Sequence, residues 1–196
     1  MAIKLTSVLP RRKWLIVSSV AVLLLVTSVF CWLWSREPPL YLTTSTEQTP
    51  AVTGYLTVDA LIDTIDWMLE KPGGYLSNDI FPPSLWLDNM PNFEFGVLVQ
   101  CRDLSRVLRN DMSRSQSQST ENADLAIAEP ALNNSNDRWI FPSTESKLRE
   151  AQDALINYRS QLVSADAPEA QFYARADNLR EWLAVVERRL GGLSQR

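Results

Sequence analysis

The chain of 196 residues contains no histidine and only two cysteines. Without histidine it cannot build a Ser-His-Asp triad, a histidine metal site or a histidine pH switch, and two cysteines cannot form a disulfide framework. Charge is uneven: the first 34 residues hold four basic residues and no acidic one, so the remaining 162 carry 15 basic and 23 acidic residues, a net charge of −8. Because an acidic domain repels phosphate, we expect no nucleic-acid partner.

A long uncharged apolar run extends from Trp14 to Trp34. As a helix rising about 1.5 Å per residue it would span roughly 31 Å, the thickness of the hydrocarbon core of a bilayer. Arg11, Arg12 and Lys13 precede it directly, which predicts a cytoplasmic N-terminus. A cleaved signal peptide would have a shorter apolar region and a small-residue cleavage site. The sequence therefore predicts an uncleaved, single-pass anchor with the rest of the chain exported.

The remaining sequence divides by composition into three further parts. Residues 1–13 form a basic cytoplasmic stub before the transmembrane helix at 14–34, and residues 35–54 form a linker rich in Pro, Thr and Ser. Residues 55–196 are long enough for one hydrophobic core. We expect a mostly α-helical fold: one N-terminal transmembrane helix and a small exported bundle of about four helices with long loops.

The first two helices of the bundle follow from the spacing of apolar residues. One is predicted over residues 57–71 and ends where Pro72 and the two glycines after it cannot continue a helix. The next is predicted to begin near Asn92 as N-cap, and it places Cys101 on the apolar face. A buried, inert thiol is the expected state of Cys101.

The last two helices are predicted to form an antiparallel hairpin over residues 144–190. The third follows Ser143 or Thr144 as N-cap, and the fourth follows Asp166 and ends at Gly191 and Gly192. Apolar residues in both helices alternate in spacing between three and four, which is typical of coiled-coil-like packing, and a short connection makes such helices antiparallel neighbours.

Two long connections carry the candidate functional residues. In residues 72–91, Tyr75 and Trp86 alternate with Asp79 and Asp88, a pattern that suits either a sugar-binding surface or aromatic side chains that fix a loop to the bundle. Asp88 could pair with Asp79 or with Glu94 as in a glycosidase, but sequence spacing does not give the separation of the carboxylates.

The connection from about Asp111 to Phe141 is polar at its start, and we expect a surface segment that is either partly mobile or extends the second helix by a turn or two. Arg106, Arg109 and Arg114 precede this segment or stand at its beginning. They either bind a phosphate or carboxylate group or pair with nearby acidic residues.

Four stretches resemble a bacterial family of unknown function, number 2333: KPGGYLSND at 71–79, PPSLWLDNMPNFEFGVLVQCRDL at 82–104, SRSQSQS at 113–119 and QFYARADNLREWL at 171–183. The resemblance implies an inner-membrane protein of Gram-negative bacteria with one N-terminal transmembrane segment and a mostly helical periplasmic domain. It supplies no catalytic, cofactor-binding or metal-binding residue. It also draws attention to the polar residues Arg175, Asp177 and Arg180, which suit an interhelical or interprotein contact.

From these observations we expect a non-enzymatic, membrane-anchored interaction or scaffold module of a cell-envelope complex, with an envelope protein as partner. No cofactor is expected, because no phosphate-binding glycine loop follows a strand. Two alternatives stay open: a cell-wall glycan binder or hydrolase that uses residues 72–91, and a self-assembling structural protein, hence a homo-oligomer. The candidate interaction surface comprises Tyr75, Asp79, Trp86, Asp88, Arg114, Arg175, Asp177 and Arg180.

Overall fold

The computed structural model describes residues 11–37, 50–115, 120–167 and 170–194. These residues form helices and no strand, which confirms the mostly α-helical class. In chain order the elements are α1 (Arg11–Trp34), α2 (Tyr55–Glu70), the 3-10 turn η1 (Ser84–Trp86), α3 (Asn89–Val107), the π-helical turn η2 (Leu108–Met112), α4 (Ala123–Leu132), α5 (Thr144–Val163) and α6 (Ala176–Ser194).

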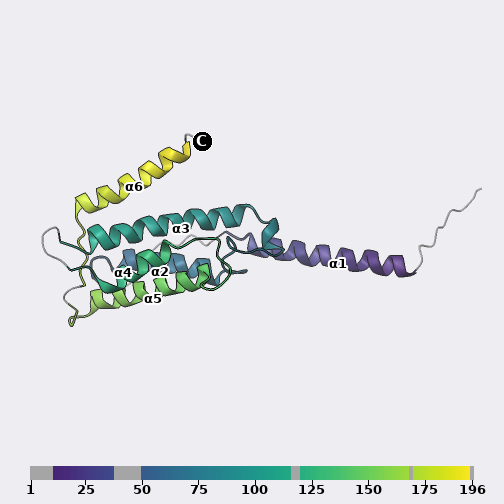
Figure 1. Cartoon of the computed structure of the whole chain (residues 1–196), viewed down its shortest axis with the longest axis horizontal. Helices are drawn as coiled ribbons and strands as arrows, with labels where there is room; N and C mark the ends of the chain where they lie inside the picture. Colours follow the sequence, from purple (N-terminus) through teal and green to yellow (C-terminus); the bar gives the residue numbers. More distant parts are fainter. Residues whose placement is uncertain (1–10, 38–49, 116–119, 168–169, 195–196) are drawn as a thin grey trace, which may run out of the picture.

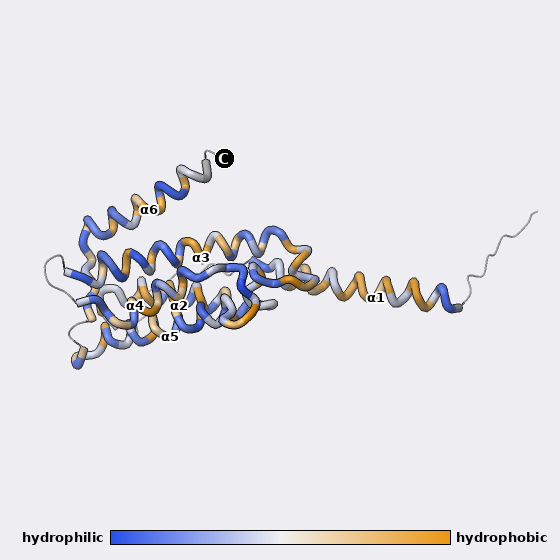
Figure 2. The backbone as a smooth tube through the Cα atoms, viewed as in Figure 1, coloured by the Kyte–Doolittle hydropathy of each residue, from blue (hydrophilic) through white to orange (hydrophobic). Residues whose placement is uncertain are grey.

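Helix α1 stands outside the bundle and extends beyond one end of it, roughly along its long axis (Figure 1). Residues Arg12–Trp34 are long and apolar enough to cross a membrane, and none of this stretch is buried by the rest of the chain. Apolar residues run along most of its length (Figure 2) and have no preferred side of the helix, which suits a helix surrounded by lipid rather than one packed on a core. Most of the predicted linker, residues 38–49, lies outside the described residues.

The core is formed mainly by α2, α3, α4 and α5. The apolar residues whose spacing predicted the first helix of the bundle are all buried on α2. That helix ends at Glu70, and Gly73 and Gly74 after it take positive φ. Helix α5 begins as predicted, because the Ser143 hydroxyl accepts a hydrogen bond from the Ser146 N–H at 3.3 Å.

Helix α4 was not predicted, because its segment was expected to be a surface connection. Asn122 caps it by accepting hydrogen bonds from the N–H groups of Asp124 and Leu125, and Leu125 and Leu132 are buried against the core. The predicted hairpin of the last two helices is also wrong, because α4 lies beside α5. Helices α5 and α6 do run in opposite directions, but α5 packs against α2 and α4, whereas α6 packs against α3 (Figure 1). They are therefore not the neighbouring hairpin that the spacing suggested.

Two helix boundaries also differ from the prediction. Helix α3 begins at Asn89 rather than near Asn92, whose side chain instead donates to the carbonyl and carboxylate oxygens of Asp88. Helix α6 begins at Ala176, ten residues after Asp166, and continues through Gly191 and Gly192, neither of which takes positive φ. Residues 171–173 are held in extended conformation by contacts with Met112, Tyr158 and Gly54, which prevent an earlier start.

Cys101 is buried as predicted, with 4% of its surface exposed, and burial raises the pKa of its thiol to about 12. The thiolate is the reactive form, so a Cys31→Ser variant should react with a maleimide near neutral pH roughly 1000-fold more slowly when folded than when unfolded. Mass spectrometry of labelling time courses in detergent with and without denaturant measures the ratio. Equal rates would contradict a closed core around α3.

Candidate functional site

The loop after α2 is organised by a buried ion pair between Lys71 and Glu94 of α3. The two side chains are 3% and 0% exposed, and Lys71 Nζ lies 2.6 Å from Glu94 Oε1. Glu94 Oε2 accepts hydrogen bonds at 2.9 Å from the N–H groups of Leu76 and Ser77. Burial raises the pKa of Glu94, while Lys71 and the two N–H groups act against that shift. One carboxylate therefore holds the loop to the bundle.

Two other residues of the same loop contact the end of α1 and the start of α5. The Trp34 ring at the end of α1 lies so close to Gly73 that an added Cβ would be 2.8 Å from it, and Gly73 has φ +91°. Asn78 donates from Nδ2 to the Arg138 carbonyl at 2.8 Å and to Glu145 Oε1 at 3.0 Å. The residues of 71–79 thus connect the end of α1 with the bundle.

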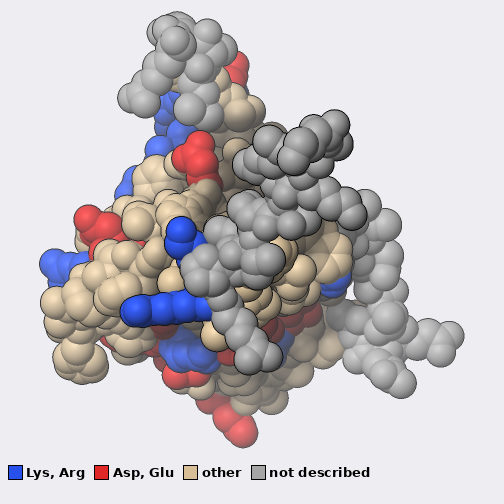
Figure 3. All heavy atoms as spheres, turned by 90° about the vertical axis from the view of Figure 1, so that its right-hand side faces the viewer, with Lys and Arg blue, Asp and Glu red and all other residues tan. Residues whose placement is uncertain are grey.

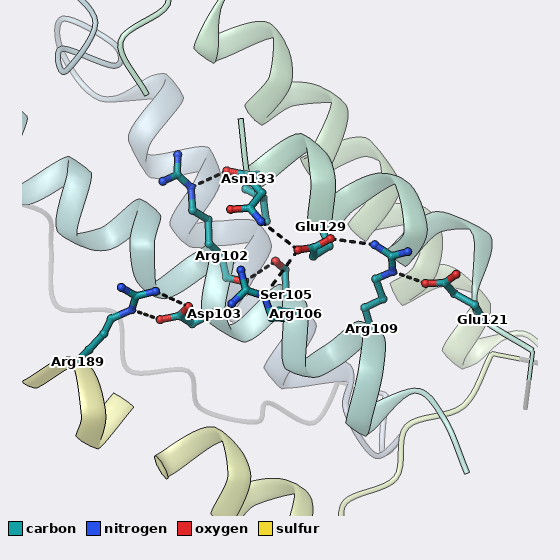
Figure 4. A network of polar contacts seen from close by, with 10 residues as sticks. Arg102, Asp103, Ser105, Arg106, Arg109, Glu121, Glu129, Asn133 and Arg189 are labelled. Atoms are coloured by element: carbon teal, nitrogen blue, oxygen red, sulfur yellow. Dashed lines mark hydrogen bonds and ion pairs between the residues drawn. The ribbon is translucent and has the colours of Figure 1, made fainter. Parts of the chain in front are cut away.

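A second set of polar contacts joins α3 to α4 (Figure 4). Arg102 donates to the carbonyl oxygens of Leu132 and Asn134, near the C-terminal end of α4, where carbonyl groups lack helical partners. Arg109 pairs with Glu129 at 2.8 Å and with Glu121. Arg106 also lies 3.8 Å from Glu129. For Arg106 and Arg109 these contacts favour pairing with acidic residues over binding of an external phosphate.

The ion pair between Arg189 and Asp103 in Figure 4 positions α6 beside α3. Arg189 Nη2 donates to Asp103 Oδ1 at 2.7 Å, and its Nε donates to the other carboxylate oxygen. Asp103 is 1% exposed and Arg189 44% exposed, so the carboxylate is buried beneath α6 while the guanidinium reaches it from the edge. A bidentate contact of this kind fixes both position and orientation.

An extended segment, residues 170–175, leads into α6 at the opposite end of the bundle from α1 (Figure 1). The Tyr173 N–H donates to the Met112 carbonyl at 2.6 Å, and Tyr158 Oη donates to the Gln171 carbonyl at 2.8 Å. The Phe172 ring lies against Gly54, whose φ is +89°. These contacts keep the segment extended and delay the start of the helix to Ala176.

Helix α6 leaves much of its apolar surface uncovered. Leu179, Leu183 and Leu190 are 48%, 53% and 59% exposed, whereas Trp182 packs against the core. Between α6 and α3 lies an open groove of about 630 Å³ lined by Asn92, Phe95, Gly96, Val99, Gln100, Arg188, Arg189 and Gly192. An exposed apolar stripe beside an open groove is the arrangement found where a protein receives a partner.

The model of one protein family, described as "Uncharacterized protein conserved in bacteria (DUF2333)", matches residues 9–196. The chain belongs to the DUF2333 family. No curated protein and no solved structure is significantly similar to it. DUF2333 membership confirms the resemblance seen in the four sequence stretches, and it assigns no activity.

In this DUF2333 protein the candidate residues fall into two groups at opposite ends of the bundle. Near α1, Trp86 is 62% exposed on η1 and Asp79 and Asp88 are exposed, but Tyr75 is only 2% exposed and Glu94 is fully buried. The structure therefore does not bring Tyr75 and Trp86 together as a sugar-binding surface, and Glu94 is engaged by Lys71 rather than facing solvent beside Asp88.

The second group lies around the start of α6. Arg175 stacks on the Tyr173 ring at 5.3 Å, and Asp177 and Arg180 are exposed on the first turns of the helix. Arg114 is also exposed, and its charge contributes to the lowered pKa of Glu121, to which Arg109 makes the largest contribution through its hydrogen bond. Of this group only Arg175 lines the open cavity of about 410 Å³ at the start of α6; Asp177, Arg180 and Arg114 are not among its lining residues.

Sequence reasoning missed the buried charges of this DUF2333 domain. Glu94 had a signal: it stands four residues after Met90 and four before Leu98, both buried, so its carboxylate had to lie on the apolar face of the helix. Asp103 and Arg189 had none, because they are 86 residues apart and meet only after α6 folds back beside α3.

Proposed function

We propose that this protein is a single-pass, membrane-anchored module of the bacterial inner membrane whose periplasmic bundle binds an envelope protein through α6 and the groove beside it. The observation that carries the proposal is the uncovered stripe Leu179, Leu183 and Leu190 on a helix held to α3 by Arg189. Soluble domains rarely leave such a stripe exposed next to an open groove unless another surface covers it.

An apolar helix of another protein is the partner that fits this surface best. Phe95, which is 40% exposed, and Val99 line the α3 wall of the groove, and α6 carries its own exposed apolar stripe beside the groove, so a helix laid along this surface would bury apolar side chains of both elements. A second copy of the same domain fits less well, because two domains of net charge −8 repel each other. The periplasmic location is supported by Arg11, Arg12 and Lys13 at the start of α1, with no comparable cluster at its other end.

The glycan alternative has less support. It depended on Tyr75 and Trp86 as one surface and on a carboxylate pair, either Asp79 with Asp88 or Asp88 with Glu94. Tyr75 and Glu94 are buried within the bundle, which leaves only the exposed Asp79 and Asp88. The side chains of Tyr75 and Glu94 cannot contact a polymer without opening the core. We therefore place the interaction module first.

The test is site-specific photocrosslinking in intact bacteria that carry the full-length chain. A benzophenone amino acid at Leu183 should give a discrete adduct with one envelope protein, and the same probe at Asp153, an exposed residue of α5, should not. Mass spectrometry identifies the adduct. Adducts with the chain itself would favour self-assembly, and equal adducts at Leu183 and Asp153, or none at Leu183, would overturn the proposed docking face.

A further inference from the structure

Two loops lie at the end of the bundle nearest α1: one connects α2 with α3 and the other connects α4 with α5. Both expose large apolar side chains. Among the described residues outside α1, the five most exposed large hydrophobic side chains all belong to these loops: Phe141 at 89%, Phe81 at 68%, Ile140 at 65%, Leu85 at 63% and Trp86 at 62%. With Ile80 and Trp139 they form what we name the loop patch. Isolated apolar residues on a surface are ordinary, but this concentration is not.

Buried polar side chains fix each of the two loops, and one of them joins the loops to each other. Asn78, which is 3% exposed and belongs to the loop between α2 and α3, donates to the carbonyl of Arg138, the residue before Trp139 in the other loop. The hydroxyl of Thr144 donates to the carbonyl oxygens of Ser135 and Arg138 at 3.0 and 3.2 Å, and the hydroxyl of Ser84 donates to the Phe81 carbonyl at 2.8 Å. Because these donors lie beneath the loops, the apolar side chains point outward on a fixed base.

The loop patch lies at the level where α1 ends. Element η1, which carries Leu85 and Trp86, contacts α1, and the Trp34 ring at the end of α1 packs on Gly73 in the preceding turn. Figure 1 shows α1 leaving the bundle from this end, and Figure 2 shows apolar colour in the loops beside it. Figure 3 views the molecule from this side, and where grey atoms do not cover the surface, residues other than Lys, Arg, Asp and Glu form much of it, with charged side chains between them.

We propose that the loop patch inserts into the periplasmic interface of the same bilayer that α1 spans, so that the bundle stands on the membrane in one orientation. The inference rests on the proposed anchoring by α1. Trp, Phe, Ile and Leu are the side chains that enter the interfacial layer, and Trp32 and Trp34 mark that layer on α1 itself. The acidic domain gains no attraction from anionic lipids, so apolar insertion provides the contact.

This orientation has a consequence for the proposed docking face. The long axis of the bundle continues the line of α1, so α6 runs from the far end of the bundle back toward the membrane (Figure 1). A bundle fixed by both α1 and the loop patch presents the groove between α3 and α6 sideways, at a constant height above the lipid. A partner embedded in the same membrane would meet it without a search over orientations.

Depth measurements by spin labelling test the inference on the full-length chain. In a Cys31→Ser background, in which Cys101 stays buried and unlabelled, single cysteines replace Phe141, Leu85, Leu24 of α1 or Asp153 of α5. The proteins are reconstituted into vesicles of phosphatidylethanolamine and phosphatidylglycerol, and power saturation compares oxygen with a water-soluble nickel chelate. Circular dichroism confirms that each labelled protein is folded.

Labels at 141 and 85 should be more accessible to oxygen than to nickel, with ratios between those of 24 and 153. If the label at position 24 lies in lipid but the labels at 141 and 85 have the accessibility ratio found at 153, α1 anchors the protein and the inference is wrong. If the 24 label also lies in water, the anchoring fails and takes the inference with it. Dipolar broadening confined to labels 141 and 85 would show a second copy on the loop patch, which would also overturn the inference.

Discussion

Replacing Lys71 with methionine should destabilise the bundle strongly, because it leaves the Glu94 carboxylate buried without its cationic partner. Lys71 and Glu94 side chains are 3% and 0% exposed, so solvent cannot replace the lost ion pair. Removing one partner of a buried pair costs about 3–5 kcal/mol. The measurement is denaturant or thermal unfolding of the full-length protein in detergent, followed by far-ultraviolet circular dichroism.

Matched variants separate this pair from ordinary surface charge. Arg149 and Glu70 form an ion pair at 3.1 Å in which both side chains are more than half exposed, so Arg149→Met should cost only about 0–1 kcal/mol. The double variant Lys71→Met/Glu94→Gln has no buried charge at the site and keeps an acceptor for the N–H groups of Leu76 and Ser77. It should lose less stability than the sum of the single variants; additive losses would mean that the two residues are not coupled.

The effect of Lys71→Met should also depend on pH. Burial already raises the pKa of Glu94 above its unfolded value, and removing Lys71 removes a cause that lowers it, so the pKa rises further. An acid with a raised folded pKa loses stability as pH rises from its unfolded value, about 4.3, through its folded value. The loss caused by Lys71→Met, relative to the unchanged protein, should therefore be smaller near pH 5 than near pH 8. A constant difference would show that Glu94 is not buried in the folded state.

The elements that the sequence predicted best are those whose ends depend on local signals. Helix α2 has a regular apolar period and a Pro-Gly-Gly stop, and α5 has Ser143 as N-cap, so neighbouring residues determine both. The predicted start of α6 was wrong because the residues before it are held extended by parts of the chain that are distant in sequence. Phe172 packs on Gly54, and the Tyr173 N–H donates to the Met112 carbonyl. Tertiary contacts override local pattern at such places.

The candidate surface shows the same division. Trp86 was chosen because aromatic and acidic residues alternate in its loop, and Arg175 and Arg180 were chosen because they lie in a stretch that resembles the family; all three are exposed. Tyr75 was misjudged because a sequence does not show whether an aromatic ring faces solvent or core. The apolar loop near Trp139 and the open face of α6 were not predicted, because they result from which helices pack together: α4 takes the place beside α5 that α6 was expected to fill.

Replacing Arg189 with alanine should release α6 from α3 without unfolding the rest of the bundle. The variant removes both hydrogen bonds to Asp103, and the freed carboxylate regains water only if α6 moves away. Because Arg189 is nearly half exposed, we expect a loss of about 1–2 kcal/mol, and so a rise of roughly tenfold in amide exchange along α6. Hydrogen–deuterium exchange of the full-length protein measures this, with α2, α4 and α5 as internal references.

Arg188→Ala is the matched control, because it removes the same charge from the adjacent position of α6 and leaves the Asp103 pair in place. Asp103→Asn should reproduce the effect of Arg189→Ala, since it removes the charge from the other side of the pair. If all three variants exchange like the unchanged protein, Trp182 and Asn178 are sufficient to hold α6. Because the proposed partner binds an α6 that is fixed beside α3, Arg189→Ala should also weaken the Leu183 photoadduct. Arg149→Met, which removes an exposed charge of α5 outside the groove, should retain the photoadduct, and that pairing of effects connects the position of one helix with the proposed function of the protein.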